Sequence, residues 1–320
     1  MRTTVLLLSW DEAGHLRRSL PAAAAQEGAE VVVVDNASSD DTESVAREHG
    51  ARYERLERRL SYAAVTNEAL RRTGGEAVLL LNADCYLEPG FLAAARPRLE
   101  EPGVGSVAPK LLRALGPDPG QRLDAIDAAG LVVDRRRKNG LVGHGRPGLA
   151  YDRPGEAFGA DGAAALYRRQ ALEDCAIDGE VLDEDLERWA SDVDLAWRAR
   201  LLGWRCVYEP RATAYHVRYY SPSTRARVPE RDRTMQFRNR YLMMVKNDTV
   251  GALARDAHRV AAYELLAFGY ALLRERHLLH GYGAAARLAR RARRRRAVLR
   301  RRLRSRGETA SVPFGLEPAP

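Results

Sequence analysis

The sequence of 320 residues contains few cysteines, very little lysine and no long apolar run. Its three cysteines lie far apart and form no C-x-x-C pair, which argues against a zinc site or a disulfide framework and favours a reducing, cytosolic compartment. No run of about 18 apolar residues occurs, so we expect no membrane-spanning helix. The N-terminal apolar run, Val5–Leu8, is too short for a signal peptide.

Two glycine-rich nucleotide-binding motifs are also absent. The sequence has neither a G-x-G-x-x-G pattern nor a Walker A lysine, which disfavours a dinucleotide-dependent enzyme and a P-loop ATPase. A nucleotidyltransferase is a further alternative, and it should carry a glycine- and Lys/Arg-rich loop after its first strand. The corresponding loop, residues 10–15, has no such cluster, so we rank this alternative low.

The positive charge is concentrated at the C-terminal end. Residues 284–320 carry twelve arginines and two acids, a charge of +10, whereas the whole chain has +9 and the remainder therefore −1. No aromatic residue lies between 284 and 306 to stack on bases, so binding to a nucleic acid is disfavoured. A basic helix that follows the apolar segment 260–273 favours contact with an anionic membrane surface. A solvated tail, and a homodimer or domain contact for 260–273, are the alternatives.

The first hundred residues alternate strand and helix signals. Apolar runs at 5–8, 31–34 and 77–81 are typical of strands buried on both faces of a sheet, and helical patterns follow them. This alternation predicts an α/β fold with a doubly wound, mainly parallel sheet. We place the main domain at 1–230, a helical region at 231–283, and an Arg-rich basic helix with a flexible tail at 284–320.

Two aspartates follow predicted strands, at the sheet edge where ligands bind in such folds. Asp35 comes directly after Val31–Val34, and a carboxylate there can accept hydrogen bonds from a ribose or a base. Asp84 closes Asn82-Ala83-Asp84 and is suited to a hard divalent cation on a diphosphate. A turn or a helix cap is the structural alternative for each.

A third acidic group lies in the second half of the main domain. Asp183–Asp185 precede Asp192 and Asp194, which stand where a helix would begin. One of these acids could act as a general base, and simple helix capping is the alternative. The spacing alone does not choose between them. Glycines on both sides of Asp161 indicate a close backbone approach.

Because these features occur together and in this order, the sequence resembles the family 2 glycosyltransferases with the GT-A fold. More narrowly, it resembles their rhamnosyltransferase-like bacterial members. The fold that this implies is a Rossmann-like, mixed but mainly parallel sheet flanked by helices, with a C-terminal helical extension. The matching stretches run in order from about residue 3 to 250, at Ser9-Trp10, 31–42 (VVVVDNASSDDT), 67–70 (NEAL), 78–84 (VLLLNAD), 159–169 (GADGAAALYRR), 191–203 (SDVDLAWRARLLG), 214–216 (AYH) and 238–247.

The resemblance also implies an inverting, metal-dependent transfer of a hexose from a UDP- or dTDP-sugar, such as dTDP-rhamnose, to a cell-surface glycan or lipid-linked acceptor. Asp84 and His216 would hold Mg²⁺ or Mn²⁺, and Asp192 would be the catalytic base. The enzyme would be cytoplasmic and peripheral to the inner face of the membrane. The nucleotide-sugar site would be formed by Ser9, Trp10, Asp35, Asn67, Asn82 and Asp84, and Asp161 and Asp194 are further candidates.

The sequence departs from the family pattern at the proposed base. Ser191 stands where the family has the Glu of a Glu-Asp pair, and Asn82 replaces the first acid of a full D-x-D element. Because Asp192 is present at the position of the base, and Asp84 and His216 at those of the metal ligands, catalysis is the leading interpretation. A catalytically weak GT-A-like partner protein in polysaccharide assembly is the alternative from another functional class.

Overall fold

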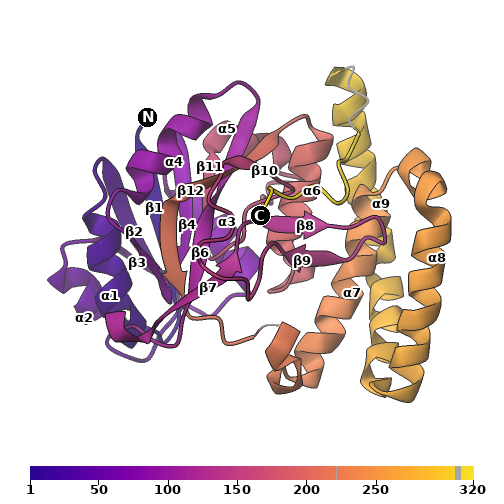
Figure 1. The fold of residues 1–320 in the computed structure, drawn as a ribbon, viewed down its shortest axis with the longest axis horizontal. Helices are drawn as coiled ribbons and strands as arrows, with labels where there is room; N and C mark the ends of the chain where they lie inside the picture. The colour runs from indigo at the N-terminus through magenta and orange to yellow at the C-terminus, as the bar shows by residue number, and fades with distance from the viewer. Residues whose placement is uncertain (221, 307–310) are drawn as a thin grey trace.

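The computed structural model describes residues 1–220, 222–306 and 311–320 (Figure 1). In this part of the chain, ten strands form one sheet in the order β10–β12–β6–β11–β4–β1–β2–β3, with β5 paired to β12 and β7 paired to β6. The strands are β1 (Thr3–Ser9), β2 (Ala29–Asp35), β3 (Arg52–Arg55), β4 (Ala77–Asn82), β5 (Cys85–Leu87), β6 (Val104–Ala114), β7 (Arg122–Ala128), β10 (Gly155–Ala157), β11 (Ala164–Arg168) and β12 (Arg205–His216). A separate hairpin consists of β8 (Leu131–Val133) and β9 (Asn139–Leu141).

Helices flank the sheet and continue beyond it. They are α1 (Ala13–Ala24), α2 (Thr42–Glu48), α3 (Tyr62–Arg72), α4 (Phe91–Glu100), α5 (Arg169–Cys175), α6 (Ser191–Leu201), α7 (Glu230–Asn247), α8 (Val250–Leu273) and α9 (Leu279–Arg306). Short 3₁₀ turns are η1 (Pro119–Gln121), η2 (Glu184–Leu186), η3 (Pro222–Arg227) and η4 (Arg276–Leu278).

The alternation of side chains along β1 shows how the sheet is covered on both faces. Val5 and Leu7 pack in one apolar core together with residues of α1 and α4, whereas Leu6 and Leu8 pack in a second core with residues of α3 and α6. Strands β1, β2, β3 and β4 run parallel, and β11 enters antiparallel between β4 and β6. The predicted α/β class with a mixed, mainly parallel sheet is therefore confirmed.

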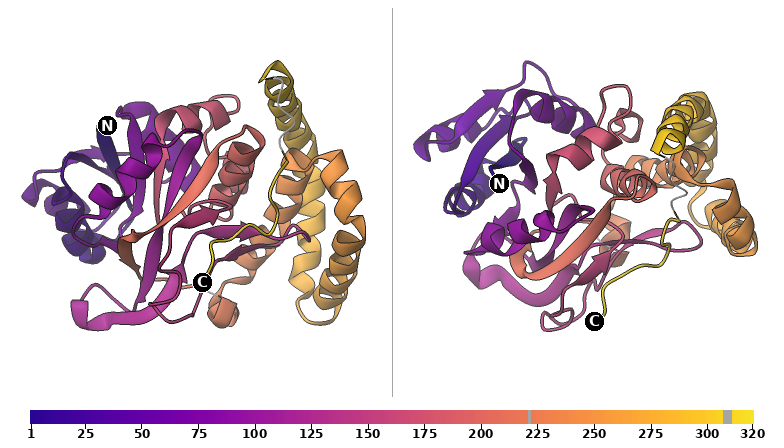
Figure 2. Two further views of the ribbon diagram at one scale, coloured as in Figure 1. Left: turned by 45° about the horizontal axis from the view of Figure 1, so that its top comes forward. Right: turned by 90° about the horizontal axis from the view of Figure 1, so that it is seen from above.

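Helices α7, α8 and α9 lie together at one end of the molecule, with α8 on the outside (Figures 1 and 2). Helix α9 runs without a break across the domain boundary that we expected at 283/284. Its arginine-rich half docks on the main domain, because Arg295 is buried and lies 2.8 Å from Glu180 and 3.3 Å from Asp183. The arginine segment is thus partly neutralised by the body rather than being a separate appendage.

Part of the expected flexible tail, residues 307–310, lies outside the described residues. The following residues, 311–320, are not helical and pack against the main domain. Phe314 packs edge-on against Trp197 at 5.2 Å between ring centroids and stacks near Phe158 at 6.3 Å. The guanidinium of Arg137 lies over the same ring at 3.9 Å. These contacts fasten the end of the chain to the main domain beside the β8–β9 hairpin. None of the described helices has the length and apolarity needed to span a bilayer.

Candidate active site

Strand pairing brings Asp84 and His216 together. Asp84 lies in the tight connection between β4 and β5, and β5 pairs with the end of β12 so that Cys85 is opposite His216. The Nε2 atom of His216 lies 3.5 Å from a carboxylate oxygen of Asp84, and both side chains are almost fully buried. The two residues that the sequence predicted as metal ligands are therefore neighbours.

Asp127 on β7 orients the His216 ring. Its Oδ2 atom lies 2.8 Å from Nδ1 of His216, which leaves Nε2 directed toward Asp84. Burial by itself would lower the pKa of His216, but the carboxylates of Asp84 and Asp127 outweigh it and raise the pKa to about 10. A carboxylate–histidine pair of this kind is the arrangement that proteins use to hold a histidine as a metal ligand.

Arg218 connects this pair to Asp161. Its Nε lies 2.7 Å from Asp127 and its terminal nitrogen 2.8 Å from Asp161. Burial by itself would raise the pKa of Asp127, but the charges of Arg218 and His216 hold it well below its usual range. Sequence reasoning missed both Asp127 and Arg218. Asp127 lies in a stretch with weak periodicity, and the signal for Arg218 was only its place two residues after His216.

The described residues contain no group of three or more His, Cys, Asp or Glu side chains placed to hold a metal ion. Asp84 supplies an oxygen donor, and His216 supplies a nitrogen donor once Nε2 releases its proton on metal binding, while Asp127 accepts from Nδ1. Because divalent cations in phosphate-handling sites take further ligands from substrate phosphates and water, two protein donors fit such an ion. The chemistry of the donor set is thus compatible with Mg²⁺ or Mn²⁺.

Asp192, the predicted base, lies at the start of α6 and is half-buried. The backbone N–H of Gly162 donates to its Oδ2 atom at 3.1 Å, and Gly162 also accepts a hydrogen bond from the Tyr62 hydroxyl at 3.4 Å. Burial and the nearby carboxylate of Asp161 raise the pKa of Asp192 to about 6. A carboxylate with a pKa near neutrality is suited to take a proton from a hydroxyl group.

Asp194 faces the protein interior, although it is only two residues from Asp192. It is fully buried and accepts hydrogen bonds from Arg198 at 3.0 Å, from Lys246 at 2.8 Å and from Asn247 at 2.8 Å. Because residues two apart lie on nearly opposite sides of a helix, Asp192 and Asp194 cannot both reach the site. The Asp194 carboxylate is occupied by three interior partners, so Asp192 is the better placed of the two candidates for the base.

The acidic stretch 183–185 likewise serves the packing of the C-terminal helices. Asp183 pairs with Lys246 and Arg295, and Asp185 lies 2.8 Å from Arg291. These acids therefore anchor α7 and α9 to the main domain and supply no base. Ser191 is buried at the first position of α6, beside Asp192.

The predicted nucleotide residues line the end of the first two strands. Asp35 is fully buried and accepts hydrogen bonds from Tyr53 at 2.6 Å and from Arg55 at 2.9 Å. Ser9 is next to it, because β1 and β2 pair with Ser9 opposite Asp35. Trp10 follows and is 39% exposed, with the Arg59 guanidinium 3.0 Å above its ring. These positions leave an aromatic ring accessible beside a buried carboxylate.

Two further predicted residues differ in their surroundings. The side chain of Asn67 is buried and bonds both backbone groups of Leu182, at 2.8 and 2.9 Å. It therefore holds the 182–184 segment in place. Asn82 is half-buried at the end of β4, where its backbone N–H donates to the carbonyl of Ala163.

Glu12, which sequence reasoning missed, belongs to the same region, since burial and the charge of Asp84 raise its pKa to about 7.

Comparisons with known proteins identify the family of the chain and proteins with a similar fold. A model of the family described as glycosyl transferase family 2 matches residues 4–176. The chain is 31% identical over 206 residues to the uncharacterized protein y4gI of Sinorhizobium fredii (strain NBRC 101917 / NGR234), which covers 58% of this chain and 21% of that protein. The chain thus spans about a fifth of the length of this curated relative.

Solved structures with a similar fold share little sequence with the chain. The 1–349 fragment of S. aureus TarS in complex with UDP-GlcNAc has a TM-score of 0.59 at 18% identity, covering 100% of this chain and 98% of that chain. GalNAc-T7 with UDP, GalNAc and Mn²⁺ has a TM-score of 0.58 at 14% identity, covering 77% and 48%. The mannosyltransferase PcManGT from Pyrobaculum calidifontis with GDP-Man and Mn²⁺ has a TM-score of 0.50 at 19% identity, covering 95% and 86%. At these identities the likeness concerns the fold.

Proposed function

The chain belongs to glycosyl transferase family 2, and from this premise we propose that it is an inverting, metal-dependent hexosyltransferase that uses a nucleotide-sugar donor. The observation that carries the proposal is the grouping of Asp84, His216 and Asp192 at one edge of the sheet. The three are linked through Asp127, Arg218, Asp161 and Gly162 by the contacts described above. In this proposal residues 1–230 form the catalytic domain, and 231–283 and 284–320 support it.

The donor diphosphate would lie beside Asp84 and His216. These two residues would hold Mg²⁺ or Mn²⁺, which when bound neutralises charge on the diphosphate leaving group. Asp127 keeps the His216 ring in the orientation that presents Nε2, since its carboxylate accepts from Nδ1 at 2.8 Å. Arg218 places a fixed positive charge in the same region, 2.7–2.8 Å from Asp127 and Asp161.

Asp192 would activate the acceptor. Its carboxylate takes the proton of the acceptor hydroxyl while the oxygen attacks the anomeric carbon from the face opposite the diphosphate. The new carbon–oxygen bond forms as the bond to the diphosphate breaks, and the leaving group departs with the electron pair, so the configuration inverts. A pKa of about 6 lets Asp192 be ionised at neutral pH and still basic enough to accept a proton.

The nucleotide would bind over the ends of β1, β2 and β4. Asp35 is buried and already accepts from Tyr53, Arg55 and the backbone N–H of Ser38, so it would supply one further hydrogen bond to the base or ribose. Trp10 offers a partly exposed ring, and Ser9 and Asn82 complete the lining. A pyrimidine donor, UDP- or dTDP-sugar and possibly in the form of dTDP-rhamnose, is our choice; it is supported by the UDP-GlcNAc and UDP in two of the similar structures. The acceptor would be a cell-surface glycan or a lipid-linked sugar, so the enzyme would act at the cytoplasmic side of an anionic membrane.

A thermal-shift panel of UDP-, dTDP- and GDP-sugars, with and without Mn²⁺, tests the donor site. We expect a pyrimidine nucleotide-sugar to stabilise the protein most, and only with Mn²⁺. Stabilisation by none of them would refute the proposal of an active donor site and favour a non-catalytic GT-A-like protein. If a GDP-sugar stabilises the protein most, the choice of a pyrimidine nucleotide is wrong, but the proposal of a donor site still stands.

Donor hydrolysis then tests the base. Asp192→Asn should lose turnover by about 10²-fold or more while it keeps nucleotide binding. Asp178→Asn is a matched control, because Asp178 is exposed and already has a positive φ of 53°, which asparagine tolerates. Equal turnover by Asp192→Asn and by the control would refute the assignment of Asp192 as the base.

A further inference from the structure

The outward face of α8 is apolar in the second half of the helix. In its second half the exposed fractions are 76% for Leu265, 74% for Leu266, 50% for Phe268, 44% for Leu272 and 79% for Leu273. Helix α8 is also the outermost helix of the C-terminal group (Figures 1 and 2). Contiguous apolar surface of this kind on a protein usually marks a contact with a membrane or a partner.

The exposed charges at both ends of this face are positive, whereas the half-buried acids Asp134 and Glu275 nearby are held in ion pairs. Arg255, His258 and Arg259 are exposed before it, and Arg274 and Arg276 are exposed after it. The only two acids of α8 point inward. Asp256 is buried against Arg135 and Arg137, and Glu264 bonds Arg240 and Tyr241. The outward face of α8 therefore offers leucines and cations but no carboxylate.

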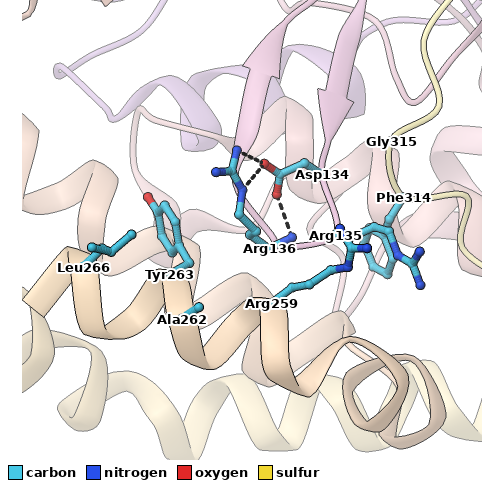
Figure 3. A pocket seen from close by; sticks show the side chains of 9 residues that line it. All are labelled: Asp134, Arg135, Arg136, Arg259, Ala262, Tyr263, Leu266, Phe314 and Gly315. Atoms are coloured by element: carbon cyan, nitrogen blue, oxygen red, sulfur yellow. Dashed lines mark hydrogen bonds and ion pairs between the residues drawn. The ribbon is translucent and has the colours of Figure 1, made fainter.

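A cavity of about 570 Å³ opens beside the same face (Figure 3). Its apolar part is formed by Ala262, Tyr263 and Leu266 of α8 and by Phe314. In Figure 3, Arg135 and Arg259 gather at the end near Phe314, whereas Tyr263 and Leu266 lie at the other end. Arg135 is paired with Asp256 and Arg136 with Asp134, which also lines the cavity. Arg259 has no ion pair with any other residue in the described part of the chain, so its charge is the one left for a ligand.

We propose that this cavity and the outward face of α8, the α8 surface, bind an anionic phospholipid membrane, with a lipid phosphate at Arg259 and an acyl chain over Leu266 and Leu265. A cationic end joined to an apolar end matches a phospholipid at the membrane surface, and arginines at both ends of the helix match anionic headgroups. This deepens the proposed membrane contact, because it places that contact on α8 rather than on the arginines of α9.

A second copy of the chain fits the α8 surface less well. Two α8 helices packed face to face would bring arginines against arginines in either direction, because both ends of the face are cationic and the face carries no acid to pair with them. Like charges at close range oppose such a contact. Headgroup phosphates, by contrast, neutralise both ends while the leucines enter the interface.

Vesicle sedimentation of the full chain tests the proposal. The parent should bind vesicles that contain an anionic phospholipid, such as phosphatidylglycerol, and should bind pure phosphatidylcholine vesicles much more weakly. Leu265→Asp and Arg259→Glu should each weaken binding about tenfold or more. Leu149→Asp is the matched control, since Leu149 is 84% exposed elsewhere on the protein. Arg300→Glu on α9, at another exposed arginine, should change binding about twofold or less.

Two other outcomes would overturn the proposal. If Leu149→Asp or Arg300→Glu weakens binding as much as Leu265→Asp, the α8 surface is not the contact. If the parent is a dimer in solution, becomes a monomer with Leu265→Asp and does not bind vesicles, the surface is a protein interface.

A short-chain soluble phosphatidic acid tests the cavity itself. It should raise the melting temperature of the parent but not of Arg259→Glu, and inorganic phosphate at the same concentration should not. If inorganic phosphate raises the melting temperature equally, the acyl chain does not contribute to binding and the proposed lipid site in the cavity is wrong. None of these measurements needs a donor sugar, so a failure here leaves the transferase proposal untouched, and the reverse also holds.

Discussion

Replacing the proposed base by asparagine should make the protein more stable at neutral pH, although it should abolish turnover. Asp192 is half-buried, and burial together with Asp161 raises its pKa from 3.8 to about 6. In the unfolded chain the same carboxyl would ionise near 3.8. Between these values the folded protein holds a proton that the unfolded chain releases, so folding loses stability as the pH rises from about 4 to about 6.

The size of the effect follows from that difference in pKa. One pKa unit is worth about 1.4 kcal/mol, so ionised Asp192 costs the fold at most about 3 kcal/mol above pH 7. Partial contact with solvent reduces this to about 1–2 kcal/mol. Asp192→Asn removes the charge and keeps a side-chain oxygen that can accept from Gly162. In a chain of this length, each kcal/mol shifts the melting temperature by about 2 °C.

Thermal melts of the parent and Asp192→Asn at pH 5, 6.5 and 8 measure this effect. The stabilisation of the variant should be about half of its full size at pH 5 and should reach its full size, a few degrees, by pH 6.5, with little further change at pH 8. Asp178→Asn should show no such growth. Asp194→Asn should instead be destabilised by about 3–5 kcal/mol, because it leaves buried Lys246 and Arg198 with an uncharged partner. A variant at Asp192 that is less stable than the parent at pH 8, or whose gain does not change with pH, would refute the reasoning.

Three further predictions concern other contacts. Phe314→Ala should cost about 3 kcal/mol in urea unfolding, since it removes the ring that packs the C-terminal segment on the main domain; an unchanged midpoint would show that this packing is not needed. Arg295→Ala should cost about 3 kcal/mol, because it leaves Asp183 buried with less compensating charge, and the loss should be smaller at acidic pH, where the acids are protonated. Asp127→Asn should weaken Mn²⁺ binding, measured by calorimetry with UDP present, by about 10–100-fold through its effect on His216, and wild-type affinity would argue against that role.

The sequence by itself determined the central strands of the sheet and which acids follow them. Three apolar runs are buried on both faces, as central strands are, and helices follow them in the structure as the sequence predicts. Asp35 and Asp84 follow such strands, and the direction of a parallel sheet then places them at one edge. These inferences are local or depend on periodicity, which the chain carries in its own order of residues.

Contacts between distant segments were decided only by the tertiary structure. Whether Asp192 or Asp194 faces the site depends on which side of α6 packs against Lys246. The spacing of the two acids in the sequence does not predict that side. The partnership of Asp127 with His216 depends on strands that meet in the sheet although they are far apart in the chain. Such pairings are selected by the free energy of the whole fold.

In the arginine-rich helix α9, too, the sequence determined the local structure and the tertiary structure decided the contacts. Its composition determined a strongly basic helix, because alternating arginines, alanines and leucines favour a helix in any context. Only the folded chain decided where the charges go. Arg295 is buried against Glu180 and Asp183, while the apolar surface left open is that of α8 and not of α9. The physical reason is that a helix sequence specifies its own faces, whereas the surface that each face covers depends on every other element of the fold.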